Sequence, residues 1–325
     1  EFRRVLFRSE AISTQAIPSQ ANSSAATPPM TQLIGIDLGG TAIKLGRFDA
    51  AGQLLAELQV PTPQPAMPGA VAVAISAAVQ QLDPDRLAPL VGIGLPGPMD
   101  AAARVARVCI NLPGWQQVPL ADWLEPELNR RVTLVNDGNA ALVGEAWLGA
   151  ARGFNDVLLL TLGTGVGGGV MIGGQLFTGH GGAAAEPGLI GVDPEGPPCN
   201  SGNRGSLEQF CSIAGLGRLS PLDPAELCCR ADAGDAEALA VWTRYGRWLG
   251  IGLTSLVYVL TPELVLIGGG LSAASHHFLP SAQAELELRV QAESRTGLQL
   301  RRAALGNGAG RLGAAKLALD RLGAP

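Results

Sequence analysis

Residues 33–46 read Leu-Ile-Gly-Ile-Asp-Leu-Gly-Gly-Thr-Ala-Ile-Lys-Leu-Gly. Apolar residues run up to Asp37, two glycines interrupt them, and an alternating pattern resumes at Thr41, as in a β-hairpin. Glycines in such a turn let the backbone approach an anion closely and direct main-chain N–H groups towards it. We therefore expect Gly39, Gly40 and Thr41 to bind phosphate, and Asp37 to hold the water of a metal ion beside that phosphate.

Taken alone, this stretch is better explained as an ordinary hairpin with a solvated aspartate. Two further stretches repeat the pattern of a strand followed by a glycine turn. Residues 157–172 pass from one apolar strand into another, and residues 264–272 pass from a buried strand into a helix. Three such turns suggest one nucleotide held between two halves of the chain. The second and third turns contain Gly163, Thr164, Gly165, Gly268, Gly269 and Gly270.

The order and spacing of the three turns resemble those of sugar kinases with the actin-like ATPase (ribonuclease H-like) fold. Within that group the chain resembles the ROK family (repressors, open reading frames and kinases), particularly its glucokinases, from about residue 32 onwards. The resemblance implies an α/β fold of two βββαβα-type domains with a cleft for nucleotide and sugar between them. It implies phosphate binding at the first two turns, adenosine binding at the third, ATP and Mg²⁺ as cofactors, and a homodimer.

The pattern of strands and helices divides the chain into an arm and two domains. Residues 1–29 are rich in Ser, Ala, Gln and Pro and predict a disordered arm. Because residue 1 is not Met and Met30 directly precedes the first strand, we hypothesise that this arm is not native. Residues 30–136, with a terminal helix at about 305–325, form a small N-terminal α/β domain, and residues 137–304 form a large C-terminal α/β domain.

Individual elements follow from local periodicity. In the first domain we predict three antiparallel strands within residues 32–60, a helix at 69–82, and buried strands at 90–95 and 132–135. The second domain restarts with the same three-stranded pattern, which indicates an internal duplication. A long helix is predicted within residues 235–260.

Composition restricts the class of protein. The chain has 325 residues, 47% of them hydrophobic and 16% charged, which is enough for two globular cores. The formal net charge of −5 argues against non-specific binding of nucleic acid. No apolar stretch reaches transmembrane length without glycine, proline or charge, and the nearest, Leu249 to Leu260, is predicted to be a buried helix. We expect a soluble cytoplasmic protein without a membrane or nucleic-acid partner.

The cysteines show no regular spacing. There are five, which predicts reduced thiols rather than a disulfide framework. The adjacent pair Cys228 and Cys229 leaves metal binding or oxidation open. The full set is Cys109, Cys199, Cys211, Cys228 and Cys229.

The candidate catalytic residue follows the strand at 132–135, in the sequence Asn-Asp-Gly-Asn-Ala at 136–140. A carboxylate at the start of a helix often only caps it. However, the carboxyl ends of strands in such sheets face the cleft. The motif resembles the Asn-Asp-x-Asn of ROK kinases, and the resemblance implies that Asp137 is the base that accepts the proton of the sugar's primary hydroxyl. A positioned carboxylate suits this role because an alcohol is a poor nucleophile at neutral pH.

Four further residues are implied to contact the sugar. Asn111, in Asn-Leu-Pro-Gly-Trp, resembles the Asn of the family's Asn-x-Pro-x-Trp loop, and Asn136 resembles a second amide contact. An amide both donates and accepts, which matches a hydroxyl. Glu186 and Glu208 match two family carboxylates that accept hydrogen bonds from vicinal hydroxyls. A turn-forming Asn and a solvated Glu remain the alternatives.

The chain departs from the family at a structural zinc site built from one His and three Cys. Leu189, Ser201 and Ser206 stand where three of those ligands are expected, and Cys199 alone remains. Neither Leu nor a neutral Ser hydroxyl replaces imidazole or thiolate on zinc, so we predict no structural zinc and a loop at 193–204 held by glycines, prolines and hydrogen bonds. Leu189 also stands where the family's His contacts the sugar. We expect the loss of that hydrogen bond to weaken sugar binding by roughly 1 kcal/mol and to change sugar preference.

These observations predict ATP-dependent phosphorylation of a hexose at its 6-hydroxyl, with glucose as the first candidate. The alternatives are a ROK kinase for fructose or an N-acetylhexosamine, and a catalytically silent sugar-binding sensor. A DNA-reading ROK repressor is disfavoured, because the polar segment before Met30 does not predict a winged helix-turn-helix. The pattern leaves open which hexose is preferred and whether polyphosphate replaces ATP.

Overall fold

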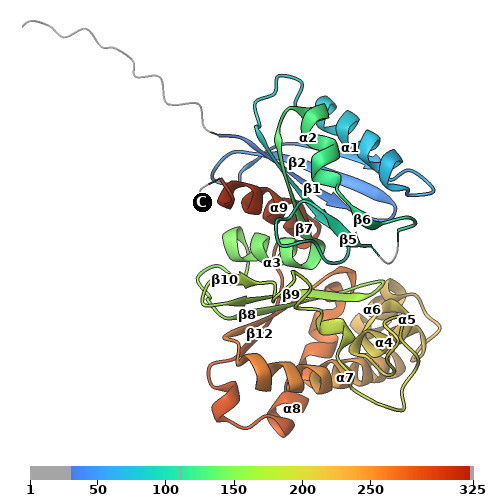
Figure 1. The fold of residues 1–325 in the computed structure, drawn as a ribbon. Coiled ribbons are helices and arrows are strands. Elements are labelled where there is room, and N and C mark those ends of the chain that lie inside the picture. Colours follow the sequence, from blue (N-terminus) through green and yellow to red (C-terminus); the bar gives the residue numbers. More distant parts are fainter. Residues whose placement is uncertain (1–30, 110–111, 323–325) are drawn as a thin grey trace, which may run out of the picture. The chain divides into compact units, whose positions relative to one another are not determined.

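The computed structural model describes residues 31–109 and 112–322 (Figure 1). The predicted arm at residues 1–29 and the predicted sugar contact Asn111 lie outside the described residues. The described chain contains two five-stranded sheets and a two-stranded ribbon.

The first sheet has the strand order β3-β2-β1-β4-β7. The first three strands pair antiparallel, and β1, β4 and β7 pair parallel. The predicted three-stranded start and both buried strands are therefore confirmed. The strands are β1 (Leu33–Leu38), β2 (Ala42–Phe48), β3 (Leu54–Pro61), β4 (Leu90–Leu95) and β7 (Arg131–Asn136).

The second sheet repeats this arrangement in the order β10-β9-β8-β11-β12. Its first three strands are again antiparallel, and β8, β11 and β12 are parallel. The duplication expected from the sequence is thus present in the topology. The strands are β8 (Val157–Leu162), β9 (Val166–Ile172), β10 (Gln175–Phe177), β11 (Leu264–Gly268) and β12 (Gln299–Arg302).

A small ribbon pairs β5 (Ala106–Val108) with β6 (Gln116–Val118). The sequence pattern did not predict it, because three-residue strands contain too few positions to show a period of two.

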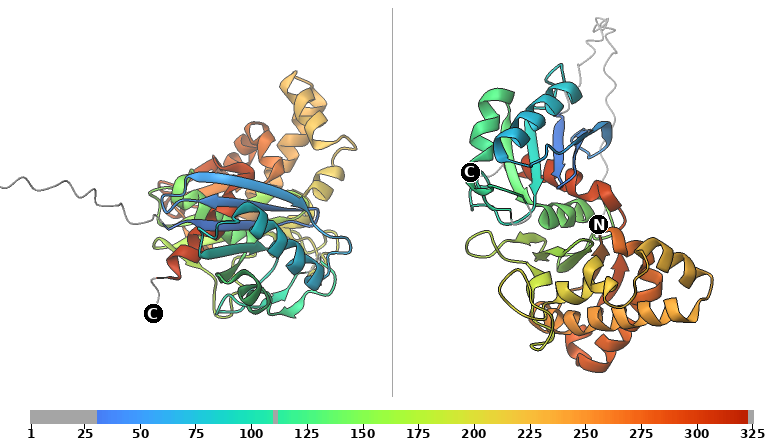
Figure 2. Two further views of the ribbon diagram at one scale, coloured as in Figure 1. Left: turned by 90° about the horizontal axis from the view of Figure 1, so that it is seen from above. Right: turned by 90° about the vertical axis from the view of Figure 1, so that its right-hand side faces the viewer.

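Helices cover both faces of the first sheet (Figure 2). Ile34 and Ile36 pack in one core with α1 (Pro68–Leu82) and α2 (Leu120–Leu128), whereas Leu33 packs on the opposite side with α9 (Ala309–Asp320). This alternation follows from the period of two in a strand.

Two glycines allow α9 to approach the first sheet closely. A Cβ on Gly35 would lie 1.7 Å from the carbonyl oxygen of Arg311, and a Cβ on Gly92 would lie 1.8 Å from that of Ala314. Either separation is far below a van der Waals contact, so a larger residue here would force the helix off the sheet.

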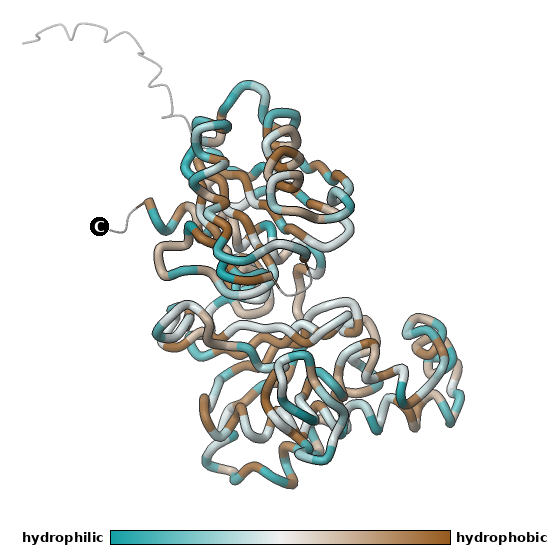
Figure 3. The backbone as a smooth tube through the Cα atoms, turned by 45° about the vertical axis from the view of Figure 1, so that its right-hand side comes forward, coloured by the Kyte–Doolittle hydropathy of each residue, from teal (hydrophilic) through white to brown (hydrophobic). Residues whose placement is uncertain are grey.

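The second sheet is also covered on both faces. Leu159 packs with Leu142 of α3 (Asp137–Leu148), while Leu158 and Leu160 pack on the other face, which carries α4 to α8. Hydrophobic residues accordingly concentrate along the strands and on the helix faces that cover them (Figure 3). The helices are α4 (Leu207–Cys211), α5 (Ile213–Gly217), α6 (Pro224–Asp232), α7 (Ala236–Leu260) and α8 (Ser275–Arg289), with 3-10 turns η1 (Pro187–Leu189), η2 (Gly270–Ala274), η3 (Glu293–Arg295) and η4 (Gly306–Gly308).

Helices α3 and α9 pack on each other and so join the two sheets (Figure 1). A Cβ on Gly313 would lie 1.7 Å from the carbonyl oxygen of Ala140, and one on Gly144 would lie 2.3 Å from that of Ala309. The terminal helix therefore returns to the first half of the chain, as expected. The division of the chain at residue 136 stays a prediction.

The long predicted helix is confirmed as α7, and Leu249, Leu253 and Val257 are buried within it. None of the helices in the described ranges combines the length and the hydrophobicity needed to cross a bilayer.

Candidate active site

The first glycine turn joins β1 to β2 and is held in place by two polar side chains that follow β3. The Thr62 hydroxyl donates to the carbonyl of Gly39 at 2.7 Å, and the Gln64 amide donates to the carbonyl of Gly40 at 2.8 Å. Gly40 and Thr41 remain exposed. Thr62 and Gln64 were not predicted from the sequence, since only the pairing of β3 with β2 brings them to this turn.

Asp37 lies at the end of β1, next to this turn. Lys44 is its neighbour across the β1–β2 pair, and the Lys44 Nζ lies 3.9 Å from an Asp37 carboxylate oxygen. Burial raises the pKa of Asp37, and the positive charges of Lys44 and Arg311 oppose this without cancelling it. A partly buried carboxylate oxygen is the kind of ligand that Mg²⁺ accepts directly or through a water.

The second glycine turn joins β8 to β9 and is supported by Glu208. A carboxylate oxygen of Glu208 accepts a hydrogen bond from the backbone N–H of Val166 at 3.0 Å. A Cβ on Gly165 would lie 2.6 Å from that same oxygen. The N–H of Gly163 donates to the carbonyl of Gly165 at 3.0 Å, and Thr164 is exposed at the tip. Glu208, predicted as a sugar ligand, therefore also supports the second glycine turn.

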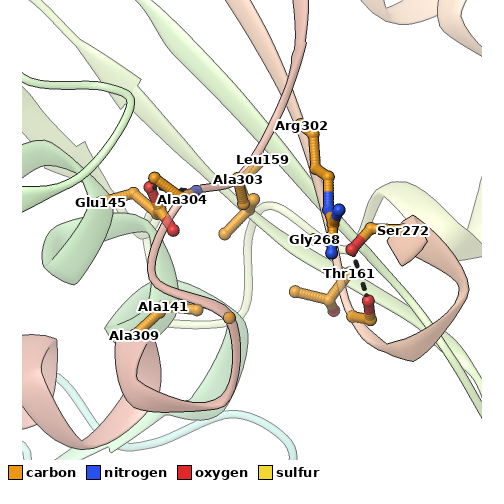
Figure 4. Close-up of a pocket in the computed structure, with 12 residues that line it drawn as sticks. Ala141, Glu145, Leu159, Thr161, Gly268, Ser272, Arg302, Ala303, Ala304 and Ala309 are labelled. Atoms are coloured by element: carbon orange, nitrogen blue, oxygen red, sulfur yellow. Dashed lines mark hydrogen bonds between the residues drawn. The ribbon is translucent and has the colours of Figure 1, made fainter. Parts of the chain in front are cut away.

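The third glycine turn borders a cavity of about 420 Å³ (Figure 4). Gly268 and Gly269 line this cavity, and Arg302 contributes a cationic side chain from the end of β12, whereas Gly270 is not among the lining residues. The Ser272 hydroxyl donates to the carbonyl of Gly269 at 2.7 Å, which shapes the turn (Figure 4). A pocket with a glycine floor and a few polar groups suits a nucleoside.

Glu145 forms part of the wall of this cavity (Figure 4). The residue is completely buried, and its carboxylate accepts hydrogen bonds from the backbone N–H groups of Ala150, Ala304 and Leu305 at 2.7 to 3.1 Å. It therefore fixes the segment that connects β12 to α9. This residue was not predicted from the sequence, although it is the one charged residue after Asp137 in the otherwise apolar helix at 137–148.

The predicted base, Asp137, is the first residue of α3 and follows its N-cap, Asn136. Asn136 accepts from the N–H of Asn139 at 3.0 Å and donates to the carbonyl of Gly97 at 3.2 Å, so its amide is mostly engaged within the protein. The Asp137 carboxylate accepts from the N–H of Gly138 at 2.8 Å.

Although Asp137 reaches solvent, the protein around it raises its pKa to about 6. Burial is the largest cause, the N–H of Gly138 opposes it, and the negative charge of Asp37 adds to it. Burial likewise raises the pKa of Glu186, and the charges of Asp137 and Glu208 raise it further. The charges of Asp37, Asp137, Glu186 and Glu208 thus act in sequence on one another's pKa values.

Cys109 also belongs to this environment. Burial and the charge of Asp137 raise the pKa of its thiol to about 12, so the thiol stays protonated. All five cysteines of the chain are free. Asn111, the remaining predicted sugar ligand, lies outside the described residues.

The loop at 193–204, which was predicted to be held without a structural zinc, contains hydrogen bonds of its own. The backbone N–H of Cys199 donates to the carbonyl of Asn203 at 2.8 Å, and the Ser201 hydroxyl donates to the Cys199 sulfur at 3.2 Å. Burial by itself would raise the pKa of the Cys199 thiol. The hydroxyls of Ser201 and Ser206, together with the backbone of Ser201, outweigh burial, so the net effect is a lowered pKa. With Leu189 in place of an imidazole, the residues of this loop do not fit a zinc ion.

Comparisons of the sequence with known proteins identify its family. The model of the ROK family matches residues 33–321. A protein named glucokinase from Thermotoga maritima is 34% identical, over 91% of this chain and 99% of its own length. A protein named N-acetyl-D-glucosamine kinase from Shigella flexneri serotype 5b is 35% identical, over 73% of this chain and 84% of its own length.

A solved structure gives the same result. The ROK family glucokinase from Streptomyces griseus, in complex with glucose and AMPPNP, superposes with a TM-score of 0.78 at 32% identity, over 89% of this chain and 99% of that one. The fold of two sheets with shared topology is thus that of ROK sugar kinases, and the chain belongs to the ROK family.

Proposed function

We propose that the chain is an ATP-dependent kinase that phosphorylates a hexose at its 6-hydroxyl, with glucose as the first candidate. The observation that carries the proposal is the position of Asp137 at the start of α3, where its pKa is raised to about 6 by burial and by the charge of Asp37, and where its own charge raises the pKa of Glu186. A base of this pKa is deprotonated at neutral pH and still able to accept a proton.

The reaction follows from this placement. The sugar's 6-oxygen attacks the γ-phosphorus of ATP, and its proton passes to the Asp137 carboxylate. The bond between the γ-phosphorus and the bridging oxygen breaks, and ADP leaves with that oxygen. The protein's contribution is mainly to position the two substrates and to offset negative charge.

The glycine turns would hold the nucleotide. We propose that the N–H groups of Gly40, Thr41, Thr164 and Gly165 bind the phosphates, since the N–H groups of Gly39 and Gly163 donate to the carbonyls of Ala42 and Gly165. We propose that the cavity beside Gly268 and Gly269 binds the adenosine. Mg²⁺, when bound, offsets charge on the phosphates, and Asp37 is the residue that would hold its water.

Two carboxylates would bind the sugar hydroxyls. One carboxylate oxygen of Glu208 accepts the hydrogen bond from the N–H of Val166, and the other oxygen would accept one from a sugar hydroxyl. Glu186 is partly exposed beside Asp137, so that its oxygens are available to a vicinal hydroxyl. Asn136 has one amide hydrogen left after its bond to Gly97.

One observation favours a second candidate, a kinase for an N-acetylhexosamine. Leu189 is partly exposed at the end of η1 and presents apolar surface where the family has an imidazole. An N-acetyl group carries a methyl that such a surface accommodates better than it does a hydroxyl. The named N-acetyl-D-glucosamine kinase among the relatives is consistent with this alternative.

We further propose that the protein works as a homodimer in the cytoplasm, where ATP is available and thiols stay reduced, and without a nucleic-acid or membrane partner.

The proposal is tested by measuring ADP release with Mg²⁺-ATP and a panel of glucose, mannose, fructose, N-acetylglucosamine and N-acetylmannosamine, in the native chain and in Asp137→Ala. Polyphosphate replaces ATP in a parallel series. Nucleotide binding is measured on both proteins, so that lost chemistry is distinguished from lost binding.

Glucose-dependent ADP release that falls by at least about 100-fold in Asp137→Ala, with nucleotide binding retained, supports the proposal. A preference for an N-acetylhexosamine selects the second candidate. Sugar binding without turnover on any member of the panel would overturn the kinase and indicate a sensor.

A further inference from the structure

Four potential metal ligands meet on the surface where α6 approaches α8. Cys228 and Asp232 are one turn apart on α6, and His276 and His277 lie in the first turn of α8. Their ligand atoms all lie within 4.8 Å of one another, which makes this the one such grouping of three or more His, Cys, Asp or Glu in residues 31–109 and 112–322. None of the four belongs to the proposed kinase site.

The two imidazoles converge on one atom. The Nε2 atoms of His276 and His277 each lie 2.8 Å from the same carboxylate oxygen of Asp232. Adjacent side chains on a helix diverge by about 100°. Convergence of both rings, whose centroids are 4.0 Å apart, is therefore not a consequence of helical geometry alone.

Cys228, the fourth residue, lies near the other oxygen of the Asp232 carboxylate. The Cys228 sulfur lies 3.8 Å from the second carboxylate oxygen of Asp232. The site is accessible to an ion, because the side chains of Asp232 and His276 are 53% and 56% exposed, while His277 is 10% exposed and anchored. Neighbouring Cys229 is exposed but stands outside the group.

We propose that Cys228, Asp232, His276 and His277 form a binding site for one divalent transition-metal ion of the zinc class. Two imidazole nitrogens, one carboxylate oxygen and one thiolate are a four-coordinate ligand set of the type that Zn²⁺ and Co²⁺ accept. Mg²⁺ and Ca²⁺ are disfavoured because they select oxygen ligands.

The charges and protons of this site balance. An ionised Asp232 and a Cys228 thiolate together neutralise the two positive charges of the ion. Burial and the nearby carboxylate raise the pKa of Cys228, so its thiol is protonated before binding and one proton leaves as the metal–sulfur bond forms. Each imidazole binds through Nε2, and its proton resides on Nδ1. The two pairs that are now 2.8 Å apart would spread slightly and the wider pairs, all within 4.8 Å, would draw together, because two ligands on a tetrahedral ion lie roughly 3.3 Å apart.

Occupancy would tie α6 to α8. The α8 helix directly follows η2, which carries Ser272 of the cavity wall. The ion would therefore stabilise the helical layer behind the third glycine turn. This inference does not depend on the proposed kinase activity.

The test uses the full chain, purified without metal and fully reduced, and titrated with Co²⁺ and Zn²⁺. The readouts are the stoichiometry by elemental analysis, the affinity by calorimetry, and the absorption of Co²⁺, in which tetrahedral geometry and a thiolate–metal charge-transfer band are visible. Two pairs of variants are compared. They are His276→Ala/His277→Ala against His180→Ala, and Cys228→Ser against Cys229→Ser.

We expect one ion per chain in the native protein and in both controls. The double His variant should lose at least about 100-fold in affinity, and Cys228→Ser should lose the charge-transfer band while Cys229→Ser keeps it. Circular dichroism of each metal-free variant confirms that it is folded. Lack of uptake by the native chain, or uptake that is unchanged in the double His variant, would overturn the proposal.

Discussion

Glu208 accepts a hydrogen bond from the backbone N–H of Val166 at 3.0 Å, directly after the second glycine turn. A single carboxylate thus touches the turn proposed to bind phosphate and lies among the residues proposed to bind sugar. We expect Glu208→Ala to raise the KM for both substrates, because the N–H of Val166 loses its partner and the turn loosens.

Glu208→Gln is the matched variant. Its amide oxygen retains the acceptor for Val166, so the KM for ATP should stay within about threefold of the native value while the KM for sugar rises by about tenfold. Steady-state kinetics with each substrate varied in turn provide the measurement. An equal rise of both KM values in Glu208→Gln would show that the two roles are not separable.

The pKa of Asp137 predicts how activity depends on pH. Because a base must be deprotonated, kcat/KM for the sugar should fall about tenfold per pH unit below pH 6 and level off above pH 7. Direct measurement of ADP between pH 5 and 8 avoids the pH limits of coupling enzymes. A profile that is flat down to pH 5 would contradict the assignment.

The same pKa has a consequence for stability. The folded-state pKa of about 6 lies above the ordinary value of 3.8, so ionisation of Asp137 lowers the free energy of unfolding as the pH rises from about 4 to above 6. Asp137→Asn should therefore be inactive and yet gain stability relative to the native chain at pH 8, with the gain vanishing near pH 4. Urea unfolding at both pH values measures this. A gain of the same size at both would point to a cause other than ionisation.

Gly138 lies where the backbone of α3 approaches the second sheet closely. A Cβ there would lie 2.2 Å from the carbonyl oxygen of Gly168. Because backbone cannot yield as a flexible side chain does, Gly138→Ala should lower the free energy of unfolding by about 2 kcal/mol or more and displace Asp137.

Gly69→Ala is the control for the same chemical change in a helix. Gly69 lies in the first turn of α1 with open space around its Cβ position, and the substitution should stabilise the protein by about 0.5 kcal/mol. Denaturant unfolding of both variants measures the difference. Equal changes in the free energy of unfolding at the two positions would mean that the close backbone contact at Gly138 does not limit the size of its side chain.

Glu145 links the nucleotide cavity to the segment that leads into α9. In Glu145→Gln an amide NH₂ replaces one of the two oxygens that accept from backbone N–H donors. This should lower the free energy of unfolding by about 2–3 kcal/mol and raise the KM for ATP. Glu263→Gln makes the same change at an exposed carboxylate that also accepts from backbone N–H groups, and should have a much smaller effect. Thermal unfolding and ATP kinetics on both variants test this. Glu145 would be dispensable if the two variants behaved alike.

Much of the fold was readable from local sequence because burial imposes a period. The alternation in 33–38 determines which residues of β1 face α1 and which face α9, and the glycines after each strand mark where the chain turns. The position of Asp137 after a buried strand was enough to place it at the start of a helix, at the carboxyl end of that strand. These are properties of a residue and its neighbours in sequence, so the sequence by itself determined them.

Contacts between side chains that are far apart in the sequence could not be predicted in this way. Thr62 reaches the first glycine turn through the pairing of β2 with β3, Glu145 reaches Ala304 through the packing of α3 against α9, and Asp232 meets His276 where α6 approaches α8. A hydrogen bond depends on distances of a few tenths of an ångström, whereas hydrophobic periodicity specifies only which face of an element is buried. Only the tertiary structure, which sets how those faces are stacked, decided which polar groups meet.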